Sequence, residues 1–140
     1  MGKKESIGIG LLGLGVVGGG VARALSERAE ALTTQVGCPL RLRRVLEKDL
    51  AKTRASKMEP HLFTTDPAEV IGDPEIDIII EALGGERPAF NFIKEAMERG
   101  KHVVTSNKEV MAKHFPEFLS LAKEKGVDIL YEASVGGGIP

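Results

Sequence analysis

Hydrophobic and polar positions along the chain follow two alternating periods. Short β-type runs rich in apolar residues are separated by stretches in which apolar residues recur every three or four positions, the pattern of amphipathic helices. The β-type runs are Ile7–Leu12, Leu40–Leu46, Ile76–Leu83, His102–Thr105 and Asp128–Tyr131. The run Ile76–Leu83 is apolar on both faces, which predicts a central parallel strand. Strands that alternate with helices in this way predict an α/β fold with a doubly wound parallel sheet.

The first two predicted helices have recognisable boundaries. After the first strand, one helix face is apolar at Val17, Val21, Leu25 and Leu32. This spacing predicts a helix to about Ala31, broken by the sequence "QVGCP". Further on, Asp66 is a suitable N-cap and Pro67 a suitable first helical residue for a short helix that stops at Gly72.

The second half of the chain predicts two longer helical regions. Pro88 opens a helix for which Gly100 is a suitable C-cap residue. Its apolar stripe consists of Phe90, Ile93 and Met97. A short turn of helix is expected after Asn107, and a separate helix over Pro116–Lys125, because proline interrupts a helix. Gly126 then ends that helix.

The amino-acid composition and the net charge narrow the class of protein and the kinds of partner. The 140 residues are 42% hydrophobic and 28% charged, which is typical of one globular domain over residues 1–140. The formal net charge of -1 indicates neither a nucleic-acid nor a membrane partner. A single cysteine, Cys38, excludes an internal disulfide and favours the cytoplasm. The chain ends on "GGGIP" without a closing helix, so we expect a fragment of a longer protein.

Three glycines stand between the first strand and the first helix as G-x-G-x-x-G. In this setting Gly13 makes a tight turn, Gly15 lets a pyrophosphate approach the backbone, and Gly18 allows close contact between helix and strand. The pattern predicts a Rossmann-type dinucleotide site; pure helix packing and another nucleotide-like ligand are the alternatives. Gly19 and Gly20 are not required by the motif, and glycine is unfavourable inside a helix. Either close packing on the sheet or room for a ligand or second domain would explain them.

The end of the second strand carries signals for both nicotinamide dinucleotides. Glu47 would accept hydrogen bonds from an adenosine ribose, as in NAD sites, whereas Lys48 would suit the 2′-phosphate of NADP. The segment from Arg41 to Lys57 holds seven basic residues against two acidic ones. It contains no aromatic residue, whereas a nucleic-acid-binding segment would favour aromatic side chains between the basic ones. The balance favours NADP slightly, with NAD or dual use open.

Three further stretches carry a family resemblance. "IIIEALGG", "KHVVTSNK" and "YEASVGGGIP", following "GLLGLGVVG", resemble the N-terminal NAD(P)-binding domain of homoserine dehydrogenase over essentially the whole chain. The resemblance implies an enzyme that interconverts aspartate 4-semialdehyde and homoserine by hydride transfer with NAD(P)(H). Such an enzyme serves the biosynthesis of threonine, methionine and isoleucine.

The resemblance also implies roles for individual residues. Besides Glu47 and Lys48, the implied cofactor contacts are Gly13, Leu14, Gly15, Val16, Val17, Gly18, Leu83, Gly84, Gly85, Ser106 and Lys108. Lys108 is the implied catalytic residue that orients substrate and nicotinamide. A cationic hydrogen-bond donor just beyond a buried strand could do so by steadying charge during hydride transfer.

The resemblance also implies a site for a monovalent cation such as Na⁺ near the end of the chain. Its ligands would come from Glu132 and from the carbonyls of Val135, Gly137 and Ile139. In the family, the acid–base lysine, its carboxylate partner and the dimerisation region lie beyond Pro140. We therefore expect the fragment to bind cofactor without turnover, and the full-length protein to form a homo-oligomer.

Two other interpretations of the function remain. It could belong to another semialdehyde or amino-acid dehydrogenase, or to a non-enzymatic module that senses NAD(H). Metal binding is not indicated, because His61, His102 and His114 lack ligand spacing and are expected at the surface or at strand ends. Ser134 lacks the nucleophile-elbow pattern of a hydrolase.

Overall fold

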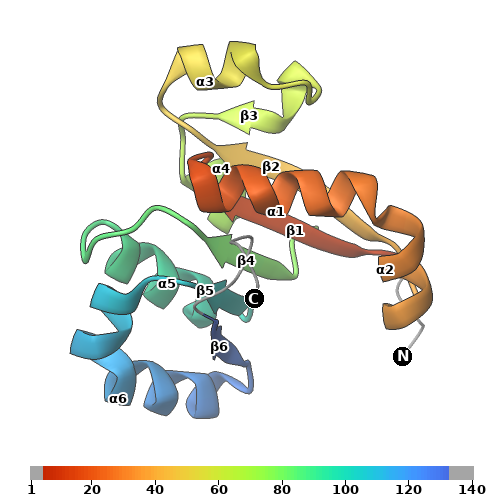
Figure 1. Ribbon diagram of the computed structural model, residues 1–140. Coiled ribbons are helices and arrows are strands. Elements are labelled where there is room, and N and C mark those ends of the chain that lie inside the picture. The colour runs from red at the N-terminus through yellow and green to blue at the C-terminus, as the bar shows by residue number, and fades with distance from the viewer. Residues whose placement is uncertain (1–4, 133–140) are drawn as a thin grey trace.

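The computed structural model describes residues 5–132, and these form one parallel sheet with helices on both sides (Figure 1). The sheet is six-stranded with the order β3-β2-β1-β4-β5-β6. Its strands are β1 Ile7–Leu12, β2 Leu40–Leu46, β3 Phe63–Thr64, β4 Ile78–Glu81, β5 His102–Thr105 and β6 Ile129–Tyr131. The order reverses between β1 and β4, the place where doubly wound sheets bind ligands. The predicted Rossmann-type fold is confirmed.

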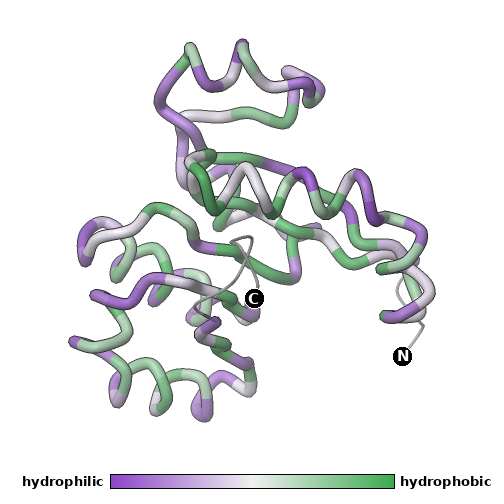
Figure 2. Tube along the Cα trace, viewed as in Figure 1, coloured by the Kyte–Doolittle hydropathy of each residue, from purple (hydrophilic) through white to green (hydrophobic). Residues whose placement is uncertain are grey.

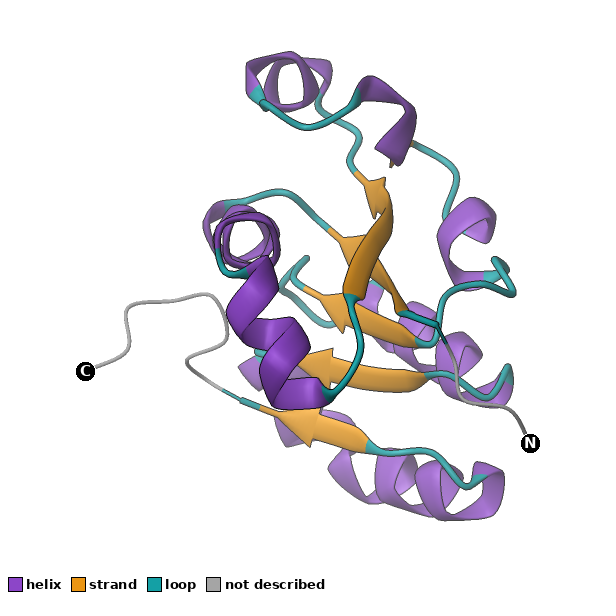
Figure 3. Ribbon diagram, turned by 90° about the vertical axis from the view of Figure 1, so that its right-hand side faces the viewer, coloured by secondary structure: helices purple, strands orange, loops and turns teal. Residues whose placement is uncertain are grey.

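Helices cover the sheet in two layers (Figure 3). They are α1 Val16–Glu27, α2 Ala29–Val36, α3 Leu50–Ala55, α4 Ala68–Ile71, α5 Ala89–Glu98 and α6 Lys108–Lys125. Helix α1 packs on one face through Val21 and Ala22, whereas α4, α5 and α6 pack on the other face. The hydrophobic residues gather along the strands between these layers (Figure 2).

The central position predicted for the strand around Ile79 is confirmed. Strand β4 pairs in parallel with β1 and with β5. Ile79 faces the core under α4, α5 and α6, and Ile80 faces the core under α1. Because successive side chains of a strand point to opposite faces, an apolar residue at every position is what burial on both sides requires.

The first helical region differs from its prediction. Instead of one helix to about Ala31, α1 ends at Glu27, and α2 follows after Arg28, whose backbone leaves the helical region (φ -112°, ψ 23°). The break also comes later than Gln35: α2 continues to Val36. Gly37, at φ 97°, is the C-cap, and its N–H donates to Thr33 O at 2.8 Å. A glycine in the left-handed conformation commonly ends a helix, and the residues before Gly37 remain helical.

The two separate helices expected around Pro116 are one continuous helix, α6. Pro116 has no N–H and cannot donate to the carbonyl of Ala112, so one hydrogen bond of the helix is lost. Met111 before the proline and Phe118 after it are both buried in the core that α5 shares. Packing on both sides of the proline therefore keeps the helix continuous.

Three elements were not predicted: helix α3, strand β3 and the short 3-10 helix η1 Pro60–Leu62. Helix α3 contains no buried residue, so it has no apolar stripe, and its N-cap Asp49 accepts from Ala51 N at 2.9 Å. Strand β3 consists of two residues that pair with the end of β2. The predicted strand Ile76–Leu83 is confirmed only over Ile78–Glu81.

Several predicted boundaries shift by one residue. Pro67, not Asp66, is the N-cap of α4, although Asp66 Oδ1 accepts from Ala68 N at 3.0 Å. Helix α5 begins after Pro88, and β6 begins at Ile129. Within residues 5–132, no helix has both the length and the apolar character to cross a bilayer. The cytoplasmic location stays a prediction.

Candidate functional site

The carboxyl ends of β1, β4 and β5 open on a cavity of about 430 Å³. Three segments line it: the start of α1, the turn after β4 and the start of α6. The lining residues are Gly15, Val16, Val17, Ala82, Leu83, Gly84, Gly85, Ser106, Asn107, Lys108 and Glu109. Thus most of the cofactor contacts implied by the sequence come together at one place, although they are up to about ninety positions apart in the chain.

The glycine-rich turn is shaped by main-chain contacts. A Cβ on Gly13, whose φ is 100°, would lie 2.8 Å from Ala82 O. A Cβ on Gly18 would lie 2.0 Å from Gly13 O, too close for any side chain. By contrast, nothing lies within 4 Å of a Cβ on Gly15, which faces open space beside the cavity. Gly13 and Gly18 therefore allow the turn to close, and Gly15 leaves its outer side accessible.

The first turn of α1 has the features of an anion site. Its N-cap is Gly15, and no side chain of the described residues caps this turn. The N–H groups at the start of a helix lack partners within the helix, and the helix dipole adds a partial positive charge there. With open space at Gly15, these donors fit a pyrophosphate group.

Glu47 lies directly beside the glycine turn. Its Oε1 accepts from Leu14 N at 2.8 Å, and its Oε2 accepts from Asp49 N at 2.9 Å. The N–H of Leu14, one of the implied cofactor contacts, is thus engaged by Glu47. Lys48 follows as an exposed residue at the same strand end.

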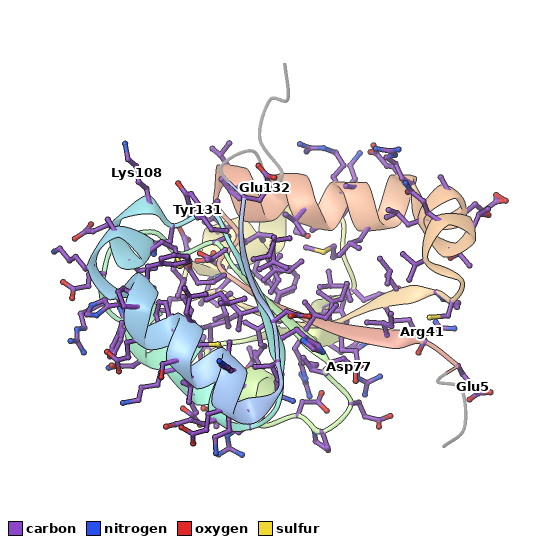
Figure 4. The ribbon with its side chains drawn as sticks, turned by 90° about the horizontal axis from the view of Figure 1, so that it is seen from below. Glu5, Arg41, Asp77, Lys108, Tyr131 and Glu132 are labelled. Carbon is purple, nitrogen blue, oxygen red and sulfur yellow. The ribbon has the colours of Figure 1, made fainter. Side chains whose placement is uncertain are left out.

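Two of the arginines between Arg41 and Lys57 are engaged by neighbouring groups. Arg41 lies at the opposite edge of the sheet from Lys108 (Figure 4). Arg43 is 3.7 Å from a carboxylate oxygen of Asp73, and Arg44 donates to His61 O at 2.9 Å. Lys48, in contrast, directly follows Glu47, whose carboxylate accepts from Leu14 N of the glycine turn.

Lys108 is the first residue of α6 and is exposed. It lines the cavity, and its side chain points away from the body of the molecule (Figure 4). Ser106, half-buried, lines the same wall. The structure thus places the start of α6 at the cavity, with the Lys108 ammonium group on its outer side.

A buried polar cluster that was not predicted from the sequence lies behind this wall. It consists of Glu81, Thr105 and Asn107, all buried at the ends of β4 and β5. Glu81 is fully buried and accepts from Leu83 N at 2.8 Å and from Gly84 N at 3.2 Å. The available signal was a carboxylate that ends an otherwise apolar strand, since such a group needs buried donors.

A second cluster of charges lies beside the cavity, on the loop before α5 and on α6. The carboxyl of Glu86 lies 2.7 Å from His114 Nε2 and accepts from Lys113 Nζ at 3.1 Å. The hydrogen bond with His114, followed by that with Lys113, lowers the pKa of Glu86. The hydrogen bonds to Glu86 and Glu109 raise the pKa of Lys113. These contacts join the loop to α6.

His61 and His102 lie as expected, whereas His114 is only partly at the surface. His61 is exposed and His102 begins β5. His114 lies within α6, half-buried, with its ring centroid 4.1 Å from that of Phe90. An imidazole can pack against an aromatic ring while its nitrogen stays bonded to a carboxylate, which makes an interior position possible.

The implied cation site is only partly within the described residues. Glu132 is exposed, and its N–H donates to Thr105 O at 2.9 Å. Val135, Gly137 and Ile139 lie outside the described residues, as does Ser134. Over residues 5–132, no three His, Cys, Asp or Glu side chains gather as a metal site.

A larger groove, of about 820 Å³, lies elsewhere, between α1, β2 and the segment from Lys52 to Leu62. Gly19 lines it, and nothing lies within 4 Å of a Cβ on this residue. Close packing on the sheet therefore does not explain Gly19. Nothing in the described part of the chain explains Gly20.

Comparison with known proteins agrees with this geometry. The family model "Homoserine dehydrogenase, NAD binding domain" matches residues 13–132. The homoserine dehydrogenase of Bacillus subtilis is 45% identical over 136 residues, which are 97% of this chain and 31% of that relative. The chain therefore spans less than a third of the length of this curated relative.

Solved structures show the same relationship. A homoserine dehydrogenase from Thiobacillus denitrificans has 42% identity and a TM-score of 0.85, over 92% of this chain and 30% of that one. A hyperthermophilic archaeal homoserine dehydrogenase, solved in complex with NADPH, has a TM-score of 0.73. At 22% identity over 92% of this chain and 44% of that one, the archaeal structure shows likeness of fold alone. Because the family model matches most of the chain, residues 13–132, we conclude that the chain belongs to the NAD-binding domains of homoserine dehydrogenases.

Proposed function

We propose that this chain holds NAD(P)(H) for an enzyme that interconverts aspartate 4-semialdehyde and homoserine, in the biosynthesis of threonine, methionine and isoleucine. The observation that carries the proposal is the uncapped start of α1 at Gly15, beside a cavity at the switch point of the sheet. A helix N-terminus at this place is suited to a pyrophosphate. Family membership supports the same cofactor class.

The residues around the cavity divide into two groups in this proposal. The turn from Gly13 to Gly18 holds the pyrophosphate through main-chain donors. The turn from Leu83 to Gly85 and the segment from Ser106 to Lys108 hold the nicotinamide end, because they form the other walls of the cavity. A nicotinamide cofactor supplies or accepts the hydride when it is bound.

Lys108 orients the substrate in this proposal. Its ammonium group extends from the rim of the cavity, where it can donate to a carbonyl oxygen. A positive charge there stabilises the negative charge that develops on that oxygen as hydride arrives. The proton exchange with the substrate belongs to residues outside this chain, so turnover is not expected from the 140 residues alone.

Calorimetric titration of the 140-residue chain tests cofactor binding. NADPH or NADH should bind with a dissociation constant below roughly 1 mM, the upper end of usual enzyme affinities. Lys108→Ala should weaken the binding of NADPH and of NADH by the same factor, because Lys108 lines the wall assigned to the nicotinamide end, which the two dinucleotides share. Absence of binding by both dinucleotides at millimolar concentration would contradict the proposal.

We further propose a preference for NADP, through Lys48. Both oxygens of Glu47 already accept main-chain hydrogen bonds, which fixes this carboxylate at the glycine turn. The exposed ammonium group of Lys48 next to it is a suitable partner for a 2′-phosphate.

Lys48→Ala should weaken NADPH binding about tenfold and leave NADH binding within about twofold, since a hydrogen bond between charged groups contributes about 1.5–3 kcal/mol at most. Arg41→Ala is the matched control, because Arg41 lies near the amino end of β2, whereas Lys48 follows the carboxyl end of the same strand. An unchanged ratio of the two affinities in Lys48→Ala would remove Lys48 from the explanation.

A further inference from the structure

The carboxylate of Glu81 is fully buried at the end of a central strand. Burial of a charge is costly unless donors surround it. Its Oε1 accepts from the hydroxyl of Thr105, and its Oε2 accepts from Leu83 N at 2.8 Å and Gly84 N at 3.2 Å. The side-chain amide of Asn107 completes the set at 3.4 Å. All four partners donate, which suits an ionised carboxylate, an acceptor only.

Three of these four donors belong to residues that line the cavity. Leu83 and Gly84 form the turn after β4, and Asn107 is the residue before Lys108 at the start of α6. Glu81 is not among the lining residues, so it lies behind the surface that a ligand would touch. The carboxylate thus joins two walls that are separate in the chain.

Asn107 makes this connection tighter. Its amide donates to Gly85 O at 2.6 Å, and its Oδ1 accepts from Val110 N at 3.1 Å as the N-cap of α6. Its main-chain N–H donates to Thr105 Oγ1 at 2.9 Å. Glu81 and Asn107 together therefore set the spacing between the turn and the first residue of the helix.

The core does not require a charge at this position. Ile79 and Ile80, the preceding residues of β4, are buried among apolar side chains. On the other side of the cavity, Glu47 accepts from Leu14 N of the glycine turn, and Gly18 packs closely against Gly13 O. The two halves of the cavity are thus supported by two different carboxylates.

Resting on the proposed function, we propose that Glu81, with Asn107, is a positioning residue for the nicotinamide half of the cofactor. It holds the turn from Leu83 to Gly85 and the start of α6 at the spacing that this half needs. The half that carries adenosine and pyrophosphate binds at the glycine turn and does not depend on it. Loss of the Glu81 charge therefore weakens the binding of the whole dinucleotide but not of its adenosine half.

The experiment compares two probes on the 140-residue chain by calorimetry. NADPH is the whole cofactor, and 2′-phospho-ADP-ribose lacks only the nicotinamide. Glu81→Gln keeps the shape but replaces charge-assisted hydrogen bonds by weaker neutral ones. It should weaken NADPH binding about tenfold, equivalent to 1.4 kcal/mol, and leave 2′-phospho-ADP-ribose within about twofold.

Glu95→Gln is the control, because it neutralises a carboxylate that accepts from Arg99 at the end of α5 and does not line the cavity. It should change neither affinity. Equal loss for both probes in Glu81→Gln would mean a general structural role and would overturn the proposal, as would no loss for either. If the wild-type chain binds neither probe, the proposed function itself is wrong, and the positioning role falls with it.

A second variant covers the case in which Glu81→Gln does not fold. Asn107→Ser keeps a side-chain oxygen that can cap α6, since serine is a favourable N-cap residue, but removes the amide that donates to Gly85 O. It should show the same loss for NADPH alone. Equal affinities of Asn107→Ser and wild type for NADPH would overturn the proposal.

Discussion

Gly18→Ala is expected to destabilise the folded chain by at least about 3 kcal/mol, because its new methyl group has no space. The Cβ would lie 2.0 Å from Gly13 O and 2.9 Å from the carbonyl carbon of the same residue. Both atoms belong to the main chain, so no side chain can rotate away. Either the glycine turn or the start of α1 must move. Urea denaturation followed by circular dichroism measures the change in the free energy of unfolding.

Gly19→Ala is the matched control, one position along the same helix. Nothing lies within 4 Å of its Cβ, so alanine gains helix propensity without a clash. We expect stabilisation by about 0.5–1 kcal/mol. Wild-type stability of Gly18→Ala would contradict the close contact between Gly13 and Gly18. Weaker NADPH binding by a stabilised Gly19→Ala would show that Gly19 leaves room for ligand.

Lys101→Met should also have a large effect, on stability alone. The ammonium group of Lys101 donates to Asp73 O and to Ile76 O, each at 2.7 Å, and the residue is only 6% exposed. Methionine fills similar space but leaves both carbonyl oxygens without this donor. Since each buried unsatisfied polar group costs about 1–3 kcal/mol, a loss of about 3 kcal/mol in the free energy of unfolding is expected.

Lys123→Met is the control for this substitution, because Lys123 is exposed on α6 and such a change usually stays within about 0.5 kcal/mol. Lys101 lies at the amino end of β5, whereas the cavity lies at the carboxyl ends of the strands. The folded form of Lys101→Met should therefore bind NADPH with wild-type affinity. Stability equal to that of Lys123→Met would show that water replaces the ammonium group at little cost.

Most of the sheet could be predicted from the sequence, because its signals are local. The apolar run around Ile79 is buried on both faces, as its composition requires. The failures occur where local preference and packing disagree. Pro116 predicts a helix break, but buried contacts at Met111 and Phe118 keep α6 continuous. Helix α3 buries no side chain, so no hydrophobic pattern could indicate it.

The candidate site divides in the same way. Gly13 and Gly18 were assigned from the spacing of a motif whose geometry depends on adjacent residues, and the close contacts are where that assignment expects them. Glu81 was missed because its partners Thr105 and Asn107 lie 24 and 26 positions away. The local signal, a carboxylate after three isoleucines, indicates only that donors are needed and not which residues supply them.

For this protein, the sequence by itself determined the succession of strands and helices, the glycine turn and the family resemblance, because each depends on neighbouring residues. Only the tertiary structure decided that Glu47 holds the glycine turn and that Glu81 joins the turn after β4 to the start of α6. Those contacts exist because parallel strands bring their carboxyl ends to one edge of the sheet. Which donors then reach a given carboxylate depends on how far each strand extends, and that is set by packing across the whole sheet.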